Sequence, residues 1–242
     1  MSKAKYIAGI RFENDLSPDS YLNDLPIIKY LSEAQSLAFE SDVTFLVGEN
    51  GTGKSTLLEA IAVAYGFNAE GGTRNFNFET KKSHSELHEH LTLIKKGLAR
   101  DGFFLRAESM YNAASYIDET GSADYYGGIS LHNQSHGESF LSIVQNRFGG
   151  KGIYLLDEPE AALSPMRQMT LMAEMKELLK KDSQFIIATH SPILMAFPGA
   201  EILQLSKKGI ERLDYKDTEH YQVTKMFLDN PEQMIGYLFS EE

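Results

Sequence analysis

The apolar residues of this chain fall into short runs, and most of these runs end at polar or small residues. Runs of about five to eight residues, rich in β-branched and aromatic side chains, are typical of buried strands. On this basis the sequence predicts strands at Tyr6–Phe12, Asp42–Asn50, Gly102–Glu108, Gly152–Pro159 and Gln184–Pro192.

Between these runs, apolar residues recur three and four positions apart, which is the spacing of helices that bury one face. The spacing predicts helices at Gly53–Phe67, Ser83–Ala99, Gly137–Phe148 and Pro165–Lys181. The second helix has Ser83 as its expected N-cap, with Glu86 three residues further on.

Strands that alternate with helices argue for a mostly parallel sheet with helices on its faces. The strands before Asp42 are expected to form a smaller antiparallel sheet, residues 201–206 and 210–215 a hairpin, and the last twenty-five residues helices. The predicted fold is therefore α/β, with a mostly parallel central sheet, a smaller N-terminal antiparallel β subdomain and a short helical subdomain. Residues 1–242 are expected to form one domain, with residues 66–147 as the inserted helical subdomain.

The stretch "GENGTGKS" (Gly48–Ser55) matches the phosphate-binding pattern G-x-x-x-x-G-K-[ST]. Glycines let the backbone curl so that its N–H groups point at phosphates, and the following helix adds its positive end. Lys54 is expected to reach the β- and γ-phosphates, and the Ser55 hydroxyl to bind Mg²⁺. The candidate nucleotide-binding residues here are Gly48, Asn50, Gly51, Gly53, Lys54, Ser55 and Thr56.

Two further strands end in polar side chains. The run "IYLLDE" places Asp157 and Glu158 at a strand end, where Asp157 would hold Mg²⁺ and Glu158 would polarise an attacking water. The run "FIIATHSP" ends near His190 and is the expected neighbour of the Asp157 strand. Doubly wound sheets bind ligands at this edge, so His190 is a candidate γ-phosphate sensor.

Composition narrows the class of protein. The formal net charge is −11, which counts against tight, unaided nucleic-acid binding without excluding a local basic patch. The chain has no cysteine, which excludes disulfides and thiolate metal sites. The N-terminus lacks the apolar core of a signal peptide, and no run approaches about eighteen apolar residues. We therefore expect a cytoplasmic protein without direct membrane insertion.

Together these motifs resemble those of ATP-binding-cassette (ABC) type ATPases, in the family's order. The stretch "SHGES" lies where that family has its LSGGQ signature, keeping Ser135 and Gly137 but placing His136 at a Gly and Glu138 at the Gln. The resemblance implies ATP and Mg²⁺ as cofactors and an ATP-sandwiched homodimer that drives an unidentified protein partner. In that dimer, Ser135 and Gly137 would cap the γ-phosphate held by the other subunit.

Two departures favour the soluble RecF, SMC and OLD-like branch, with its stand-alone AAA family ATPases, over transporter subunits. The signature is degenerate, and no Gln follows the strand at residues 102–108, where Glu108 or Ser109 would have to replace it. The D-loop "EAALS" also ends in Ser164, where Asp is usual. Three alternatives stay open: an ABC transporter subunit, a DNA-repair or phage-defence ATPase with a separate effector, and a kinase. The pairing of Glu158 with His190 favours water over a kinase substrate.

Overall fold

The computed structural model describes residues 5–13, 15–73, 85–107 and 131–240. Its main sheet has six strands in the order β5-β6-β7-β3-β8-β9, of which the first five are parallel and β9 is antiparallel to β8. These strands are β5 (Asp101–Arg106), β6 (Gly152–Asp157), β7 (Gln184–Ala188), β3 (Val43–Val47), β8 (Glu201–Ser206) and β9 (Gly209–Leu213). The predicted α/β class, the mostly parallel sheet and the terminal hairpin are confirmed.

A smaller antiparallel sheet has the order β2-β1-β4, with β2 at Ser36–Ala38, β1 at Ile7–Phe12 and β4 at Leu91–Lys95. The predicted helix Ser83–Ala99 is wrong in its described part. Ser85 caps the 3-10 helix η2 (Glu86–His90), and the chain then pairs with β1 as β4. The run Leu91–Lys95 contains a Thr and an Ile, which favour strands, and of its five residues only Leu91 is buried. Pairing with β1 therefore decides its conformation against the local helical spacing.

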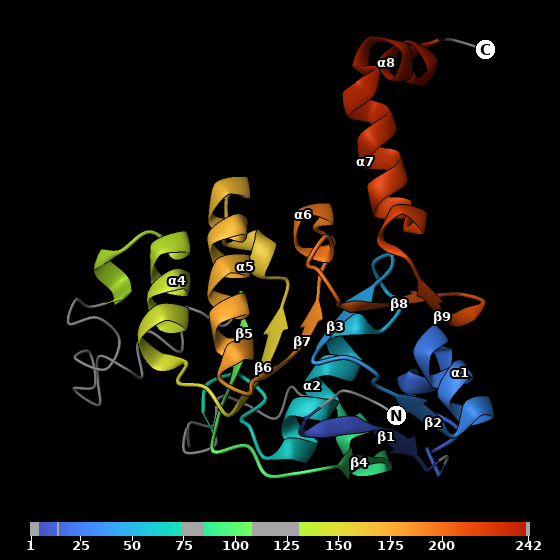
Figure 1. The fold of residues 1–242 in the computed structure, drawn as a ribbon. Helices are drawn as coiled ribbons and strands as arrows, with labels where there is room; N and C mark the ends of the chain where they lie inside the picture. Colours follow the sequence, from blue (N-terminus) through green and yellow to red (C-terminus); the bar gives the residue numbers. More distant parts are fainter. Residues whose placement is uncertain (1–4, 14, 74–84, 108–130, 241–242) are drawn as a thin grey trace.

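The helices cover both faces of the main sheet (Figure 1). The helices near the sheet are α1 (Pro26–Ala34), α2 (Lys54–Tyr65), α4 (His136–Arg147), α5 (Pro165–Lys180) and α6 (Pro192–Met195), and the C-terminal helices are α7 (Glu219–Asp229) and α8 (Pro231–Phe239). Single 3-10 turns occur at η1 (Tyr21–Asp24), η4 (Leu131–Asn133), η5 (Pro159–Ala161) and η6 (Tyr215–Asp217). The helices predicted to follow Gly53, Gly137 and Pro165, and those at the C-terminus, are confirmed.

Two apolar cores lie on the two faces of the main sheet. Val43, Phe45 and Val47 of β3 face one core together with side chains of α4 and α5, whereas Leu46 faces the other core together with α2. This alternation is what a strand buried on both faces requires. It places α2, which follows the phosphate-binding loop Gly48–Ser55 (the P-loop), on one face of the sheet. Helix α4, which follows the signature, lies on the other face.

Figure 1 shows α7 and α8 rising away from the rest of the chain, beyond the edge at which β6 and β7 end. Neither helix has a buried residue. Within the described residues, no helix combines the length and apolar character needed to cross a membrane. The helical subdomain at residues 66–147 stays a prediction, because 74–84 and 108–130 lie outside the described ranges.

Candidate functional site

The loop Gly48–Ser55 joins β3 to α2 and curls tightly. Gly48, Gly51 and Gly53 have φ angles of 140°, 80° and 97°, which favour glycine. A Cβ on Gly48 would lie 2.2 Å from the Leu205 carbonyl oxygen, so the loop packs directly against β8. At Gly53, the N-cap of α2, a Cβ would lie 2.3 Å from Ile27 Cγ2. The glycines therefore serve both the curl and the close packing.

Lys54 is buried beneath this loop. Its Nζ donates to the carbonyl oxygens of Gly48 at 2.8 Å and Glu49 at 3.0 Å. Burial lowers the pKa of Lys54, and the nearby carboxylates of Glu158 and Asp157 act in the opposite direction. A buried ammonium held by two carbonyls of a glycine-rich loop can exchange them for phosphate oxygens, which are stronger partners. The loop therefore fits a nucleoside triphosphate.

Asp157 and Glu158 end β6 as predicted. Asp157 is buried, and Glu158 adopts a left-handed conformation with φ 47° that turns the chain away from the strand. Arg106 at the end of β5 approaches Asp157, with its Nε 3.4 Å from Asp157 Oδ2. Its Nη1 also donates to Glu59 Oε2 of α2 at 2.8 Å. Sequence reasoning missed Arg106, because only the parallel pairing of β5 with β6 places it opposite Asp157.

His190 follows β7, which is the neighbour of β6, as predicted. Its Nε2 lies 3.8 Å from Glu158 Oε1. Glu160, two residues beyond Glu158, is a contact that sequence reasoning did not assign. It accepts from Thr189 Oγ1 at 2.7 Å and from His190 N at 2.5 Å, and burial raises its pKa. Glu160 therefore ties the D-loop to the backbone of His190.

These groups meet at one cavity of about 680 Å³. Glu49 and Asn50 of the P-loop line one side of it, and Glu158 and His190 line another. The first turn of α7 completes the wall with His220, which sequence reasoning also missed. The cavity is therefore bounded by three loops at one sheet edge and by a helix from the far end of the chain.

Ser135 is the N-cap of α4, and the residue at the signature's Gln position explains its local structure. Glu138 Oε2 accepts from Ser135 N at 2.9 Å and from Ser135 Oγ at 2.6 Å. Arg167 of α5 donates to Ser135 Oγ at 3.1 Å and to Glu138 Oε1 at 3.0 Å. A Cβ on Gly137 would lie 2.5 Å from Arg167 Nη1 and 2.8 Å from the Ala162 carbonyl oxygen. The predicted helix start is confirmed, and it packs closely on the D-loop.

Glu108 and Ser109, the candidates for the missing Gln, lie outside the described residues. Among the residues that are described, no three His, Asp or Glu side chains gather as a metal site. Mg²⁺ is usually held by one or two carboxylates together with phosphates and water. Ser55 at the start of α2 and Asp157 at the end of β6 supply a donor set of that kind, with oxygen atoms only.

Comparison with known proteins places these features in a family. Residues 27–213 match the AAA domain family. The ribose import ATP-binding protein RbsA of Bacillus cereus (strain ZK / E33L) is 26% identical over 195 residues, which cover 69% of this chain and 38% of the relative. The chain thus spans about two fifths of the length of this curated relative.

Two solved structures are also similar. The SMC head domain from Thermotoga maritima has a TM-score of 0.47 at 16% identity, covering 87% of this chain and 99% of that structure. CbiO1 from Clostridium perfringens, part of the ABC transporter complex CbiONQ, has a TM-score of 0.47 at 16% identity, covering 97% and 98%. The family match alone spans well over half of the chain. The chain belongs to the AAA domain family, and the predicted resemblance to ABC-type P-loop ATPases is confirmed.

Proposed function

We propose that this protein binds ATP with Mg²⁺ and hydrolyses it. The observation that carries the proposal is the order of β6, β7 and β3 in the sheet, which brings Glu158, His190 and the P-loop to one cavity. Each group alone has a structural explanation. Their meeting at the carboxyl edge of a parallel sheet, where such folds bind ligands, is what a nucleotide site requires.

The P-loop would hold the phosphates. Backbone N–H groups between Gly48 and Ser55 donate to them, with Asn50 and Thr56 at the margins, and Lys54 moves from its carbonyl partners to a phosphate oxygen. Ser55 and Asp157 would hold Mg²⁺, which neutralises charge on the phosphates when bound. Arg106 already places a cation beside Asp157, so this carboxylate stands in positive surroundings before nucleotide binds.

Glu158 and His190 would handle the attacking water. Glu158 is part-exposed at the cavity, where its carboxylate can accept a proton from water. His190 Nε2, 3.8 Å away, has no hydrogen-bond partner among the described residues, which leaves its N–H to donate to a phosphate oxygen at this cavity. A base and a phosphate contact on adjacent strands favour transfer to water.

The second half of the site would come from another copy of the chain. Ser135 is exposed, and its helix α4 packs on the face of the sheet opposite to α2. This separation supports a site in which Ser135 and Gly137 of one subunit complete the P-loop of the other. Closure of such a homodimer around ATP would then drive an unidentified protein partner in the cytoplasm.

A transporter role is the second candidate, because RbsA is named as an import ATP-binding protein. Two observations support a stand-alone ATPase instead of a transporter subunit. Glu138, at the signature's Gln position, accepts hydrogen bonds from Ser135 and Arg167 of its own chain. In addition, no Gln follows β5, at the position where the family's Mg²⁺ and water contact is expected. Copurification of the chain with a membrane fraction would favour the transporter role.

The test is a pair of variants. Lys54→Ala should abolish ATP binding in calorimetry, and unchanged affinity would remove the P-loop assignment. Glu158→Gln should bind ATP, lose at least about a hundredfold in turnover and accumulate as a dimer in light scattering with ATP. Glu177→Gln, a change at an exposed position of α5, is the matched control and should turn over ATP as the wild type does. A Glu158→Gln variant that stays monomeric with ATP would contradict the sandwiched dimer.

A further inference from the structure

Two histidine rings meet at the wall of the cavity. His190 Nδ1 lies 3.0 Å from His220 Nε2, and the two ring centroids are 5.2 Å apart. His190 follows β7, whereas His220 lies in the first turn of α7, thirty positions later. Both rings also line the cavity together with Glu158. A residue from the C-terminal helices therefore contacts the candidate phosphate sensor directly.

A hydrogen bond between two ring nitrogens needs one donor and one acceptor, so at least one ring must be neutral. Burial lowers the pKa of both histidines, and Lys54 acts on His190 in the same direction. Glu158 opposes that shift at His190, and Glu219 opposes it at His220. The lowered pKa favours the neutral form of both rings.

The surroundings select one arrangement of the protons. His190 Nε2 faces the carboxylate of Glu158 at 3.8 Å, where an N–H is favourable and a lone pair is not. With its proton on Nε2, His190 must accept at Nδ1, so His220 donates from Nε2. The other nitrogen of His220, Nδ1, has no hydrogen-bond partner in the part of the chain that the structure describes, as suits a neutral ring with its proton on Nε2.

We propose that His220 is a positioning residue for His190, which it orients and holds in the tautomer that donates from Nε2 toward the phosphate site. The proposal rests on the proposed ATPase function. It assigns to the C-terminal helices a part in hydrolysis, because α7 carries the donor. Outer partners of this kind fix the ring orientation and proton position of a working histidine.

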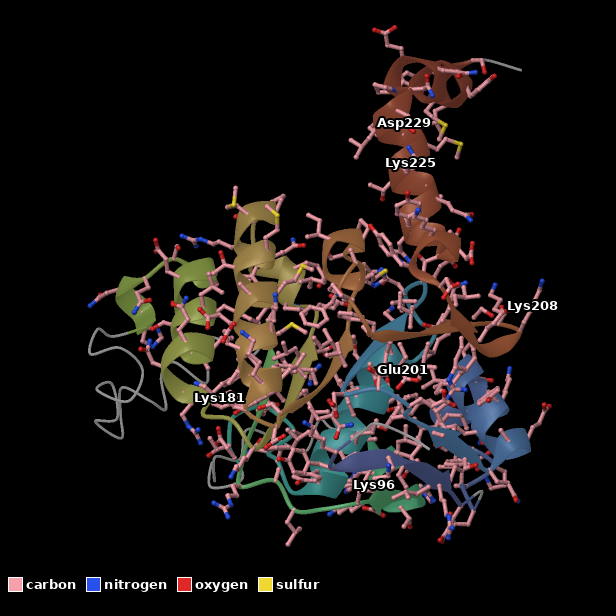
Figure 2. All side chains as sticks on the ribbon, viewed as in Figure 1. Lys96, Lys181, Glu201, Lys208, Lys225 and Asp229 are labelled. Atoms are coloured by element: carbon pink, nitrogen blue, oxygen red, sulfur yellow. The ribbon has the colours of Figure 1, made fainter. Side chains whose placement is uncertain are left out.

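The contact depends on how the first turn of α7 is attached to the body. Thr218, which is buried, caps the helix by accepting from Tyr221 N at 3.3 Å, and Tyr221 packs on Tyr215. Further along the helix, Lys225 and Asp229 pair with each other and line a second cavity together with Pro192 at the start of α6 (Figure 2). His220 therefore lies where α7 joins the body, so the position of α7 decides whether its donor reaches His190.

The experiment compares three variants by steady-state hydrolysis of ATP. His220→Phe keeps a ring but removes the donor, and should lower kcat on the order of tenfold with KM little changed. His220→Gln places an amide N–H near the position of Nε2 and should restore most of kcat. Gln222→Ala, which removes a contact from α7 to the Lys216 carbonyl oxygen, is the matched control and should resemble the wild type. A His220→Phe variant with kcat within about twofold of the wild type would overturn the proposal.

A spectroscopic readout separates this inference from the proposed function. Nitrogen-15 NMR of the full chain should show His190 protonated at Nε2 in the wild type and a mixture of tautomers in His220→Phe. If the wild type does not hydrolyse ATP, the proposed function fails, and the NMR result still decides the His220 contact. If the wild type hydrolyses ATP and His190 has the same tautomer in both proteins, only the inference fails.

Coupling to α7 has its own test. Thr218→Val removes the cap of α7 and should lower kcat in the wild-type background by loosening the His220 contact. In the His220→Phe background that contact is already absent, so the same change should have little further effect. Losses that multiply in the double variant would show that Thr218 acts independently of His220 and would overturn the coupling.

Discussion

Arg106 Nε lies 3.4 Å from Asp157 Oδ2, so the side chain that ends β5 supplies a cation to the carboxylate that ends the adjacent strand. The two side chains are largely buried, with exposed fractions of 20% and 8%. Because parallel pairing sets Arg106 opposite Asp157, this contact depends on the register of the sheet.

Arg106→Met should destabilise the nucleotide-free protein by about 3 kcal/mol, because it leaves the buried Asp157 with less compensation. Mg²⁺ and ATP should restore more stability in this variant than in the wild type, since the metal would neutralise the same carboxylate. Chemical denaturation with and without Mg²⁺ and ATP measures both effects. Lys180→Met, which removes an exposed pair with Glu177, is the control and should behave as the wild type. If Mg²⁺ and ATP stabilise Arg106→Met and the wild type equally, Arg106 and the metal do not compensate the same carboxylate.

Gly137→Ala should destabilise the protein by about 1–3 kcal/mol, because overpacking forces its neighbours to move. The new Cβ would lie 2.8 Å from the Ala162 carbonyl oxygen, which is backbone and cannot swing aside. Gly236→Ala is the matched control, since no atom of the described residues lies within 4 Å of the added Cβ in α8. Urea denaturation should show a loss for the first variant only. Equal stability of the two variants would mean that α4 is not held against the D-loop.

Gln184→Leu should cost about 3 kcal/mol in the free energy of unfolding, because buried backbone groups would lose their partners. Gln184 Oε1 accepts from Tyr6 N at 2.8 Å and from Ile7 N at 2.9 Å, and its Nε2 donates to Ile7 O at 2.8 Å. These bonds join β1 of the small sheet to β7 of the main sheet. Gln145→Leu, on the exposed side of α4, should leave the thermal midpoint unchanged. A similar midpoint for both would show that the sheets do not depend on this link.

Asp101 should make stability depend on acid pH. Burial would raise the pKa of Asp101, but hydrogen bonds from Gly149 N, Arg147 and Tyr154 together lower it below its usual range. A lowered pKa in the folded protein adds stability above the unfolded value of about 3.9, and this stability is lost as the pH falls through the folded value. The gap in unfolding free energy between wild type and Asp101→Asn should therefore narrow as the pH is lowered from 6. Tyr154→Phe keeps the Asp101 carboxylate but removes one of its hydrogen bonds, so its unfolding free energy should change less steeply with pH than that of the wild type. A difference between wild type and Asp101→Asn that stays constant with pH would contradict a lowered pKa of Asp101.

Ser135→Arg should leave ATP binding by the single chain intact and block hydrolysis. A long cationic side chain at this exposed N-cap would occupy the surface expected to meet the nucleotide of a second subunit. Calorimetry measures the first property and phosphate release the second. Asn146→Arg, at an exposed position near the other end of α4, should preserve both. Turnover at the wild-type rate in Ser135→Arg would remove the signature role of this residue.

Most helices and strands of the fold could be predicted from the local pattern of apolar and polar residues. The apolar runs that became β3, β6 and β7 are continuous because these strands are buried on both faces, and such runs are distinct in any sequence. The strand at Leu91–Lys95 was predicted as a helix for the opposite reason. It lies in the small sheet, with only part of its length buried, so its residues carry a weak signal that helical spacing can imitate.

The chemistry of the site was readable from the chain wherever one short motif carries it. The P-loop, Asp157 with Glu158, and His190 each follow an apolar run, so their place at a strand end needs no knowledge of the rest of the molecule. Arg106, Glu160 and His220 were not readable in this way. Each acquires its partner through sheet order, a turn or a distant helix, and no spacing along the chain encodes those contacts. Local sequence thus determined the groups that short motifs bring to the site, and tertiary packing decided which other residues join them and how all of them are held, because hydrogen bonds and ion pairs depend on distances that only the folded chain sets.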